Sequence, residues 1–236
     1  MIKVRKSEER GYAHHGWLES FHSFSFAGYH DPEYMGFGPL LVINEDLVQP
    51  QTGFGTHGHR NMEILTYMLA GELSHRDSLG GGSAIRPGQI QRMSAGTGIR
   101  HSEMNQHPSE VAHLLQIWIQ PSVQGVEPGY MDHDLDLASI TGQLGLIATG
   151  DQAEANSKGI AFIHQDARVY AGRLGAQDLD VTLDPARKVY LHVARGALLS
   201  NGLALQTGDA LMVSEEKALK LDVAGQAEVL LFDLPA

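Results

Sequence analysis

Short apolar runs, separated by turn residues, recur along the first half of the chain. They cover residues 40–43, 63–69, 99–104 and 113–120, and glycine, proline, asparagine or aspartate closes them. Runs of this length without a helical period predict β-strands. Pro87-Gly88 has the sequence of a type II turn, and residues 95–98 form another tight turn. Many short strands joined by turns predict an all-β fold of the antiparallel sandwich or barrel type.

The second half of the chain repeats this pattern after a polar segment. Residues 121–140 are rich in proline, glycine and aspartate, which favours a linker. Strand-like runs resume at 159–163, 166–174, 189–193 and 228–232. We therefore expect a duplicated β-barrel, divided into domains 1–135 and 136–236.

Composition and charge limit the classes of function. The chain has 236 residues, 27 of them glycine, and a net charge of −11. Since nucleic-acid binders carry basic surfaces, the acidic balance argues against nucleic acid and anionic membranes as partners. The absence of cysteine excludes disulfides and thiolate chemistry. No apolar run reaches the roughly 20 residues that a membrane-spanning helix needs, so we expect a cytoplasmic protein.

Two short histidine patterns carry the candidate chemistry. His57 and His59 are two residues apart, and so are His101 and Glu103. Side chains two apart on a strand share a face. Two such strands facing each other would direct three imidazoles and one carboxylate toward one point. This donor set suits a divalent transition metal such as iron, manganese, cobalt, nickel, copper or zinc.

The number of protein ligands bears on the choice of metal. Four protein ligands close a tetrahedral zinc site, whereas catalytic zinc usually has three. An octahedral ion with the same four ligands keeps two positions for a substrate, or for a substrate and O₂. A catalytic site of this kind therefore favours Fe(II) or a similar ion over zinc.

Glu63 competes with Glu103 for the fourth ligand position. Residues 57, 59, 61 and 63 alternate inward along the strand, so we expect Glu63 to share the face of the histidines. However, Glu63 starts about 13 Å along that strand from His59, at about 3.3 Å per residue. Glu103 starts much closer to His101. We favour Glu103, with Glu63 behind the ligands or at the rim.

The other histidines show no comparable pairing. We expect seven of them to be solvated, namely His14, His15, His22, His30, His75, His107 and His133. Three others lie in strand-like runs and are expected to be packed or hydrogen-bonded, namely His113, His164 and His192.

The chain resembles the pirin family of the cupin superfamily. The resemblance lies in residues 54–63 (FGTHGHRNME) and 93–103 (MSAGTGIRHSE). The opening around residues 14–32 (HHGWLESFHSFSFAGYHDP) is similar to that of the bacterial pirin-like quercetin dioxygenases, as is the ending at 228–235 (EVLLFDLP). The match is strongest over residues 10–120.

The resemblance implies a bicupin fold, in which two jelly-roll-type β-barrels pack face to face and only the N-terminal one holds metal. Cupins in general have a glutamate a few residues after His-x-His, a spacing that Glu63 fits. Pirins instead hold iron with the positions that match His57, His59, His101 and Glu103, so the resemblance selects Glu103.

The same resemblance implies an enzyme, a quercetin 2,3-dioxygenase. Its flavonol-like aromatic substrate would bind the metal through the 3-hydroxyl, with Glu103 as the catalytic general base. O₂ would then open the ring with release of carbon monoxide. An alternative is a non-enzymatic, iron-dependent redox sensor that acts through a protein partner. A third hypothesis is a structural metal in a binding barrel.

Overall fold

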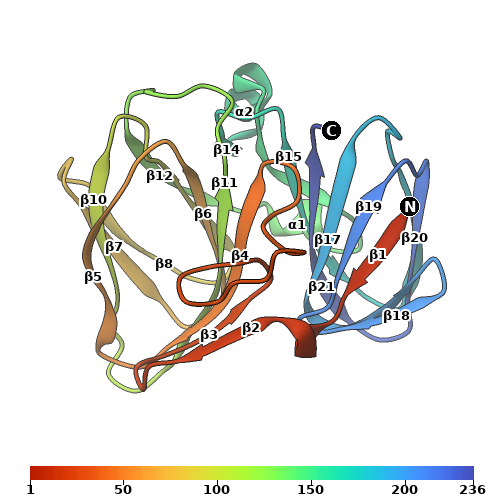
Figure 1. Cartoon of the computed structure of the whole chain (residues 1–236), viewed down its shortest axis with the longest axis horizontal. Helices are drawn as coiled ribbons and strands as arrows, with labels where there is room; N and C mark the ends of the chain where they lie inside the picture. The colour runs from red at the N-terminus through yellow and green to blue at the C-terminus, as the bar shows by residue number, and fades with distance from the viewer. The chain divides into compact units, whose positions relative to one another are not determined.

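The computed structural model describes residues 1–236, which form two compact units. The first, here called the histidine unit, comprises residues 11–135 and 150–165. The second, the C-terminal unit, comprises residues 1–10, 136–149 and 166–236. Both units consist mainly of antiparallel strands (Figure 1). The assignment of domains 1–135 and 136–236 stays a prediction, and the compact units differ from it by exchanging residues 1–10 and 150–165.

The histidine unit contains two sheets. One has the strand order β5-β10-β7-β8, and the other has the order β12-β9-β6-β11-β4-β3-β2. The strands are β2 (Gly11–His14), β3 (Leu18–His22), β4 (Leu40–Val48), β5 (Thr52–His59), β6 (Glu63–Ala70), β7 (Leu73–Asp77), β8 (Gly82–Ile85), β9 (Gln89–Ser94), β10 (Ile99–Asn105), β11 (Ala112–Ile119) and β12 (Gly129–Asp134). Residues 150–165 add α2 (Gln152–Lys158) and β14 (Ala161–Phe162).

The C-terminal unit is built around one sheet with the order β1-β19-β17-β21-β15-β13. The long strand β17 also pairs with β18 and β20, and β20 pairs with β16. The elements are β1 (Ile2–Arg5), the 3-10 helix Ser7–Glu9, α1 (Leu137–Ile140), β13 (Gly145–Thr149), β15 (Arg168–Leu174), β16 (Gln177–Thr182), β17 (Lys188–Ser200), β18 (Leu203–Gln206), β19 (Ala210–Ser214), β20 (Ala218–Val223) and β21 (Ala227–Leu234).

The predicted strand pattern and the all-β bicupin class are confirmed. The four apolar runs of the first half become β4, β6, β10 and β11, and three runs of the second half become β15, β17 and β21. Gly88 has φ +93°, and the Gln89 amide donates to the Arg86 carbonyl at 3.0 Å, as a type II turn requires. The sheets do not close into barrels, in contrast to our expectation. The face-to-face packing of the two halves stays a prediction.

The linker prediction for residues 121–140 is wrong in part. Residues 129–134 form β12, which pairs along its whole length with β9. Tyr130 packs against a buried cluster around Ile64 and Met93, so this strand belongs to the unit's core. The polar residues that suggested a linker instead serve local structure: Asp136, for example, caps α1 by accepting the Ala138 amide at 3.0 Å.

Alternation along β10 directs the candidate ligands inward. Ile99, His101, Glu103 and Asn105 are buried, whereas the alternate residues are exposed or half-buried, namely Arg100, Ser102 and Met104. A second buried apolar cluster of the unit is formed by residues of several strands, namely Leu18, Val48, Met68, Leu73, Ile85, Ala112 and Leu114. No helix of the structure is long and apolar enough to cross a membrane.

Candidate metal centre

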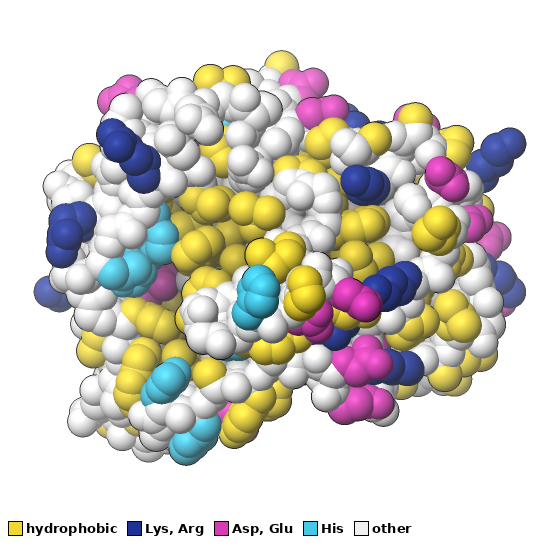
Figure 2. Space-filling view, viewed as in Figure 1, with side chains coloured by type: hydrophobic (Ala, Val, Ile, Leu, Met, Phe, Trp, Pro, Cys, Tyr) yellow, Lys and Arg dark blue, Asp and Glu magenta, His cyan; other side chains and the backbone are white.

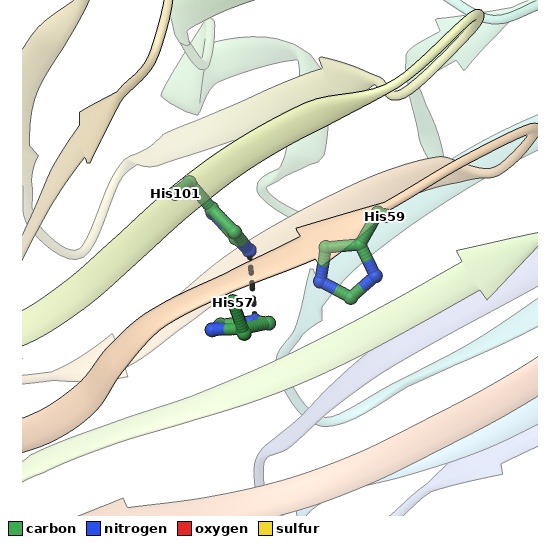
Figure 3. A group of neighbouring side chains, drawn as sticks. All are labelled: His57, His59 and His101. Carbon is green, nitrogen blue, oxygen red and sulfur yellow. Dashed lines mark hydrogen bonds between the residues drawn. The ribbon is translucent and has the colours of Figure 1, made fainter.

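Three imidazoles converge where β5 lies beside β10. His57 is the direct partner of His101 across the antiparallel pair, and their Nε2 atoms are 3.0 Å apart. The His59 ring centroid lies 4.8 Å from that of His57 and 5.0 Å from that of His101. Figure 3 shows the three rings turned toward one region, two from β5 and one from β10. The ligand atoms of all three lie within 4.8 Å of one another, a spacing that suits one metal ion.

A β-bulge between the two strands sets this register. His101 pairs with His57, but Glu103 pairs with Phe54. Two residues of β5, Gly55 and Thr56, therefore face the single Ser102 of β10. A bulge bends its strand and redirects the side chains beside it. As a result His57 and Phe54, three residues apart, both line the same cavity.

The protonation of the rings favours metal binding. The Nδ1 atom of His57 lies 2.8 Å from the Gly55 carbonyl, so Nδ1–H donates and Nε2 keeps its lone pair. Burial, and then the charge of His57, lowers the pKa of His59 to about 4. Burial, and then the surrounding imidazoles, lowers the pKa of His101 to about 3. Both rings are therefore neutral near pH 7, which is the form that binds metal.

Glu103 is a buried carboxylate, and only one of its two oxygens has a hydrogen-bond partner. Its Oε2 accepts a hydrogen bond from Gln116 Nε2 at 3.1 Å, and Gln116 is held in turn by Thr66 at 3.1 Å. Its buried Oε1 has no hydrogen-bond partner. Burial raises the pKa of Glu103 to about 7, although the bond from Gln116 lowers it. A buried, unpaired carboxylate oxygen is costly unless a cation faces it, so the residue fits a metal site.

The structure groups the four predicted residues in two overlapping sets. One contains His57, His59 and His101, and the other contains His75, His101 and Glu103. His101 is the member that both sets share. The metal set His57, His59, His101 and Glu103 therefore fits the donor chemistry and stays a prediction as a complete coordination shell.

Glu63 does not share the face of the histidines. β5 ends at His59 and β6 begins at Glu63, with Asn61 at φ +48° between them, so the alternation assumed across this stretch is broken. The Glu63 carboxylate accepts hydrogen bonds from Ser94 Oγ at 2.8 Å and from His164 Nδ1 at 3.1 Å. It is absent from the lining of the cavity described below.

Two histidines that we expected to be solvated are buried instead. His22 is 4 % exposed, and its Nδ1 lies 2.9 Å from Asn44 Oδ1. His75 is 1 % exposed and stands opposite Glu103 on β7. A signal for His75 was present in the sequence: His75 and Asp77 repeat the two-residue spacing of His101 and Glu103. The expectation of packed or hydrogen-bonded His113 and His164 is confirmed by their bonds to Glu45 and Glu63.

The candidate ligands line a cavity of about 600 Å³. Aromatic rings form much of its wall, namely Tyr12, Phe26, Tyr29, Phe54 and Trp118. The Trp118 ring packs edge-on against His59, with centroids 4.9 Å apart. Figure 2 shows histidines bordering hydrophobic side chains on the side of the molecule where Figure 1 draws β5 and β10. The cavity thus offers a flat apolar wall next to metal-binding groups.

A polar strip on β3 and β4 also lines the cavity. It consists of Ser20, His22, Asn44 and Asp46. Ser20 is hydrogen-bonded to Asp46, and burial raises the pKa of Asp46 to about 6 against that bond. The cavity can therefore contact both the rings and the hydroxyl groups of a small molecule.

Sequence comparison places this architecture among known proteins. Residues 3–119 match the family model described as Pirin, and residues 146–234 match the model described as quercetinase C-terminal cupin domain. A relative from Escherichia coli K12 named quercetin 2,3-dioxygenase is 43% identical over 236 residues, covering 100% of this chain and 99% of that protein. The chain belongs to the pirin family. The resemblance to bacterial pirin-like quercetin 2,3-dioxygenases is thereby confirmed.

Solved structures agree with this pirin assignment. The E. coli bacterial pirin YhhW in complex with nickel(II) superimposes with a TM-score of 0.93 at 42% identity, covering 100% of this pirin and 99% of that chain. A quercetin 2,3-dioxygenase from Acinetobacter baumannii has a TM-score of 0.80 at 23% identity, covering 99% and 86%, which supports the fold. Both metal-capable groups of this pirin lie in the histidine unit, on β5, β7 and β10.

Proposed function

We propose that this pirin is a metal-dependent dioxygenase that cleaves flavonols such as quercetin and releases carbon monoxide. The observation that carries the proposal is the pair of overlapping ligand groups that share His101 on the wall of an aromatic-lined cavity. One group contains His57 and His59, and the other contains Glu103 with its unpaired oxygen. The name of the 43% identical relative supports the same reaction.

The proposed metal ligands are His57, His59, His101 and Glu103. When bound, a divalent metal supplies Lewis acidity, because it lowers the pKa of a hydroxyl that reaches it and stabilises the resulting oxyanion. A dication balanced by the single carboxylate of Glu103 leaves a net positive site, which suits a phenolate. We favour Fe(II), but these ligand types also suit manganese, cobalt, nickel, copper and zinc. The nickel complex of the E. coli pirin supports a divalent metal rather than iron in particular.

The proposed catalytic residue is Glu103. In the metal-free site, burial raises the pKa of its carboxyl group to about 7, and a carboxylate in this range can act as a general base. It would accept the proton of the flavonol 3-hydroxyl, while Gln116 holds its other oxygen in place. The residue therefore has two proposed roles, as a ligand and as a proton acceptor.

The cavity walls would bind and orient the substrate. The edges and faces of Phe26, Phe54 and Trp118 suit the planar rings of a flavonol. The same apolar surroundings would keep water away from the reacting ring, and we propose O₂ as the co-substrate that opens it. The cytoplasmic location stays a prediction, and so does the alternative of a redox sensor that acts on a protein partner.

Metal analysis combined with turnover tests this proposal. The natively expressed protein is analysed for metal, stripped with a chelator, and reloaded separately with Fe(II), Mn(II), Co(II), Ni(II) or Zn(II) without oxygen. Loss of quercetin absorbance is then followed after O₂ is admitted. We expect turnover with at least one redox-active metal and none in the stripped protein. Equal rates in stripped and loaded protein would contradict a metal-dependent reaction.

A further inference from the structure

Two buried side chains, His75 and Asp77, lie next to the candidate ligand His101 on the side away from His57. β7 pairs with β10 so that Asp77 stands opposite His101 and His75 stands opposite Glu103. Directly opposed residues on neighbouring strands share a face. The side chains of His75 and Asp77 have no exposed area. Neither residue has a role in the function proposed above.

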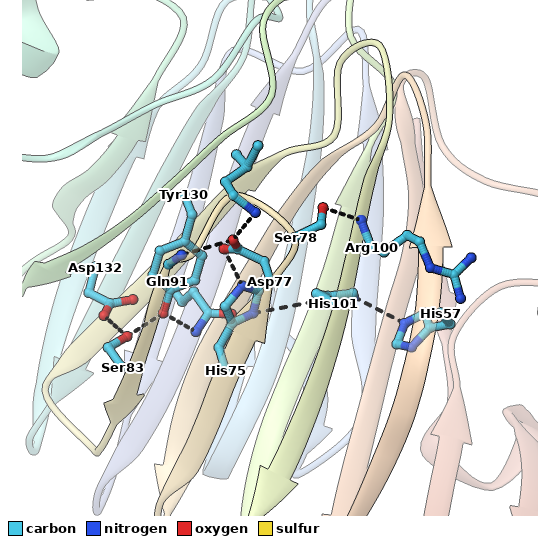
Figure 4. Close-up of polar contacts among 12 residues, drawn as sticks. His57, His75, Asp77, Ser78, Ser83, Gln91, Arg100, His101, Tyr130 and Asp132 are labelled. Atoms are coloured by element: carbon cyan, nitrogen blue, oxygen red, sulfur yellow. Dashed lines mark hydrogen bonds and ion pairs between the residues drawn. The ribbon is translucent and has the colours of Figure 1, made fainter.

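These side chains form one continuous line of contacts, which is hydrogen-bonded from Asp77 to His101. Asp77 Oδ2 lies 3.0 Å from His75 Nε2. His75 Nδ1 lies 3.2 Å from His101 Nδ1, and His101 Nε2 lies 3.0 Å from His57 Nε2. Figure 4 shows the row running from Asp77 across β7 and β10 to His57 on β5.

The hydrogen bonds of Asp77 determine which ring nitrogen of His75 and of His101 carries the proton. Asp77 Oδ1 accepts the backbone amides of Leu79 at 2.8 Å and Gly81 at 3.1 Å, so its partners are donors and it acts as a carboxylate. A carboxylate only accepts, so His75 must carry its proton on Nε2. Its Nδ1 is then an acceptor, and His101 must carry its proton on Nδ1. The lone pair of His101 consequently lies on Nε2, facing His57.

The ring of His75 is held in the plane that this line requires. Tyr130 stacks on it with centroids 4.0 Å apart and planes 19° apart. The Tyr130 hydroxyl accepts from Gln91 Nε2 at 2.8 Å and is hydrogen-bonded to Ser83. Ser83 is bonded in turn to Asp132. A buried ring fixed by stacking and by a polar network has one orientation toward His101.

We propose that Asp77 and His75 are positioning residues for the metal centre, because together they fix the Nδ1–H form of His101 and so keep its Nε2 free to bind metal. Groups behind the ligands commonly set ligand tautomer and orientation, and their loss costs about 10- to 100-fold in metal affinity. The inference rests on the metal centre of the proposed function and is independent of its substrate.

The substitution Asp77→Asn tests this directly. Asparagine has nearly the same shape, and its oxygen can still accept the two backbone amides, which keeps the amide from rotating. Its NH₂ group then donates to His75 Nε2, which reverses both imidazoles and puts the proton of His101 on Nε2. We expect the affinity for Ni(II), measured by calorimetry on the full-length protein, to fall about 10- to 100-fold.

Nitrogen NMR of the metal-free protein gives a second readout that is separate from activity. In the wild type we expect a protonated Nδ1 and an unprotonated Nε2 on His101, with the proton of His75 on Nε2. In Asp77→Asn we expect each assignment to be reversed. Because the wild-type spectrum alone tests the predicted tautomers, the test holds even if the variant fails to fold.

Asp134→Asn is the matched control. Asp134 is exposed on β12, so this variant removes the same charge without touching the line from Asp77 to His101. Its Ni(II) affinity should equal that of the wild type. Wild-type Ni(II) affinity in Asp77→Asn, or a proton on His101 Nε2 in the wild type, overturns the inference. A protein that shows the expected tautomers but fails to cleave quercetin refutes the proposed function alone.

Discussion

Glu103 is the residue on which the candidate site depends most. It is 2 % exposed, and one of its oxygens is paired while the other is not. Glu63 is equally buried, but both of its oxygens have partners. The two glutamates therefore differ in what surrounds them, and only Glu103 lines the cavity.

This contrast predicts opposite results for the same substitution. Glu103→Gln removes a negative ligand and the proton acceptor, so we expect weaker metal binding and quercetin turnover reduced about a hundredfold or more. Glu63→Gln, the control, should keep both. Metal content and initial rates of the two purified variants check this. Wild-type turnover in Glu103→Gln would exclude Glu103 from the reaction.

At the level of elements, the close approach of β5 and β10 holds the two histidine patterns together. Gly53 is the position of closest contact, since a Cβ added there would lie 2.1 Å from the Glu103 carbonyl oxygen. Gly55, on the same strand at the bulge, has no atom within 4 Å of such a Cβ. Only the first glycine is therefore required by packing against β10.

We predict that Gly53→Ala forces the strands apart at the metal centre. It should reduce stability by about 1–3 kcal/mol, as overpacking does, and weaken Ni(II) binding. Gly55→Ala is the matched control and should change neither quantity. Urea unfolding of the metal-free proteins and Ni(II) calorimetry measure the two effects. Equal Ni(II) affinities for the two variants would show that this contact does not position the ligands.

The same two strands show what the sequence could predict. Alternation within one strand correctly paired His57 with His59, and His101 with Glu103. It failed for Glu63, because a turn with Asn61 at positive φ intervenes, and turns of this kind follow from neighbouring elements rather than from residue spacing. Alternation also did not place His75 beside the candidate ligands, because the pairing of β7 with β10 cannot be read from spacing within one strand. Strand pairing is a long-range property that a single sequence specifies only weakly.

At the level of the whole molecule, each compact unit contains segments that are far apart in the sequence. Contacts between these segments must therefore hold each unit together. In the C-terminal unit, Asp209 anchors the first residues of the chain. It is fully buried and accepts the Ser7 amide at 2.7 Å, the Gln206 amide at 3.1 Å and Lys6 Nζ at 3.1 Å. Burial alone would raise the pKa of Asp209. The hydrogen bonds from these donors have a larger combined effect and lower the pKa below its ordinary value.

This anchor predicts an acid dependence of stability. A carboxyl group with a lowered folded-state pKa stabilises the fold above its unfolded-state pKa of about 3.9, and this contribution is lost as the pH falls through the folded-state value. Asp209→Asn should therefore cost about 1.5–3 kcal/mol at neutral pH and progressively less in acid. Urea unfolding across this pH range measures it.

The control for this prediction is Asp178→Asn. Asp178 is exposed, and its side chain lies 3.7 Å from Lys220 across the surface. We expect a change within about 0.5 kcal/mol at every pH. A constant difference between wild type and Asp209→Asn from neutral pH to strong acid would mean that the ionised carboxylate of Asp209 is not what secures the first residues.

One measurement tests the proposed chemistry of the metal centre most directly. The protein is loaded with Fe(II) without oxygen, mixed with quercetin and exposed to O₂, and carbon monoxide is quantified alongside quercetin consumed. We predict one carbon monoxide for each quercetin, and none from Glu103→Gln. Quercetin consumption without carbon monoxide, or no consumption by fully loaded protein, would contradict the proposed dioxygenase.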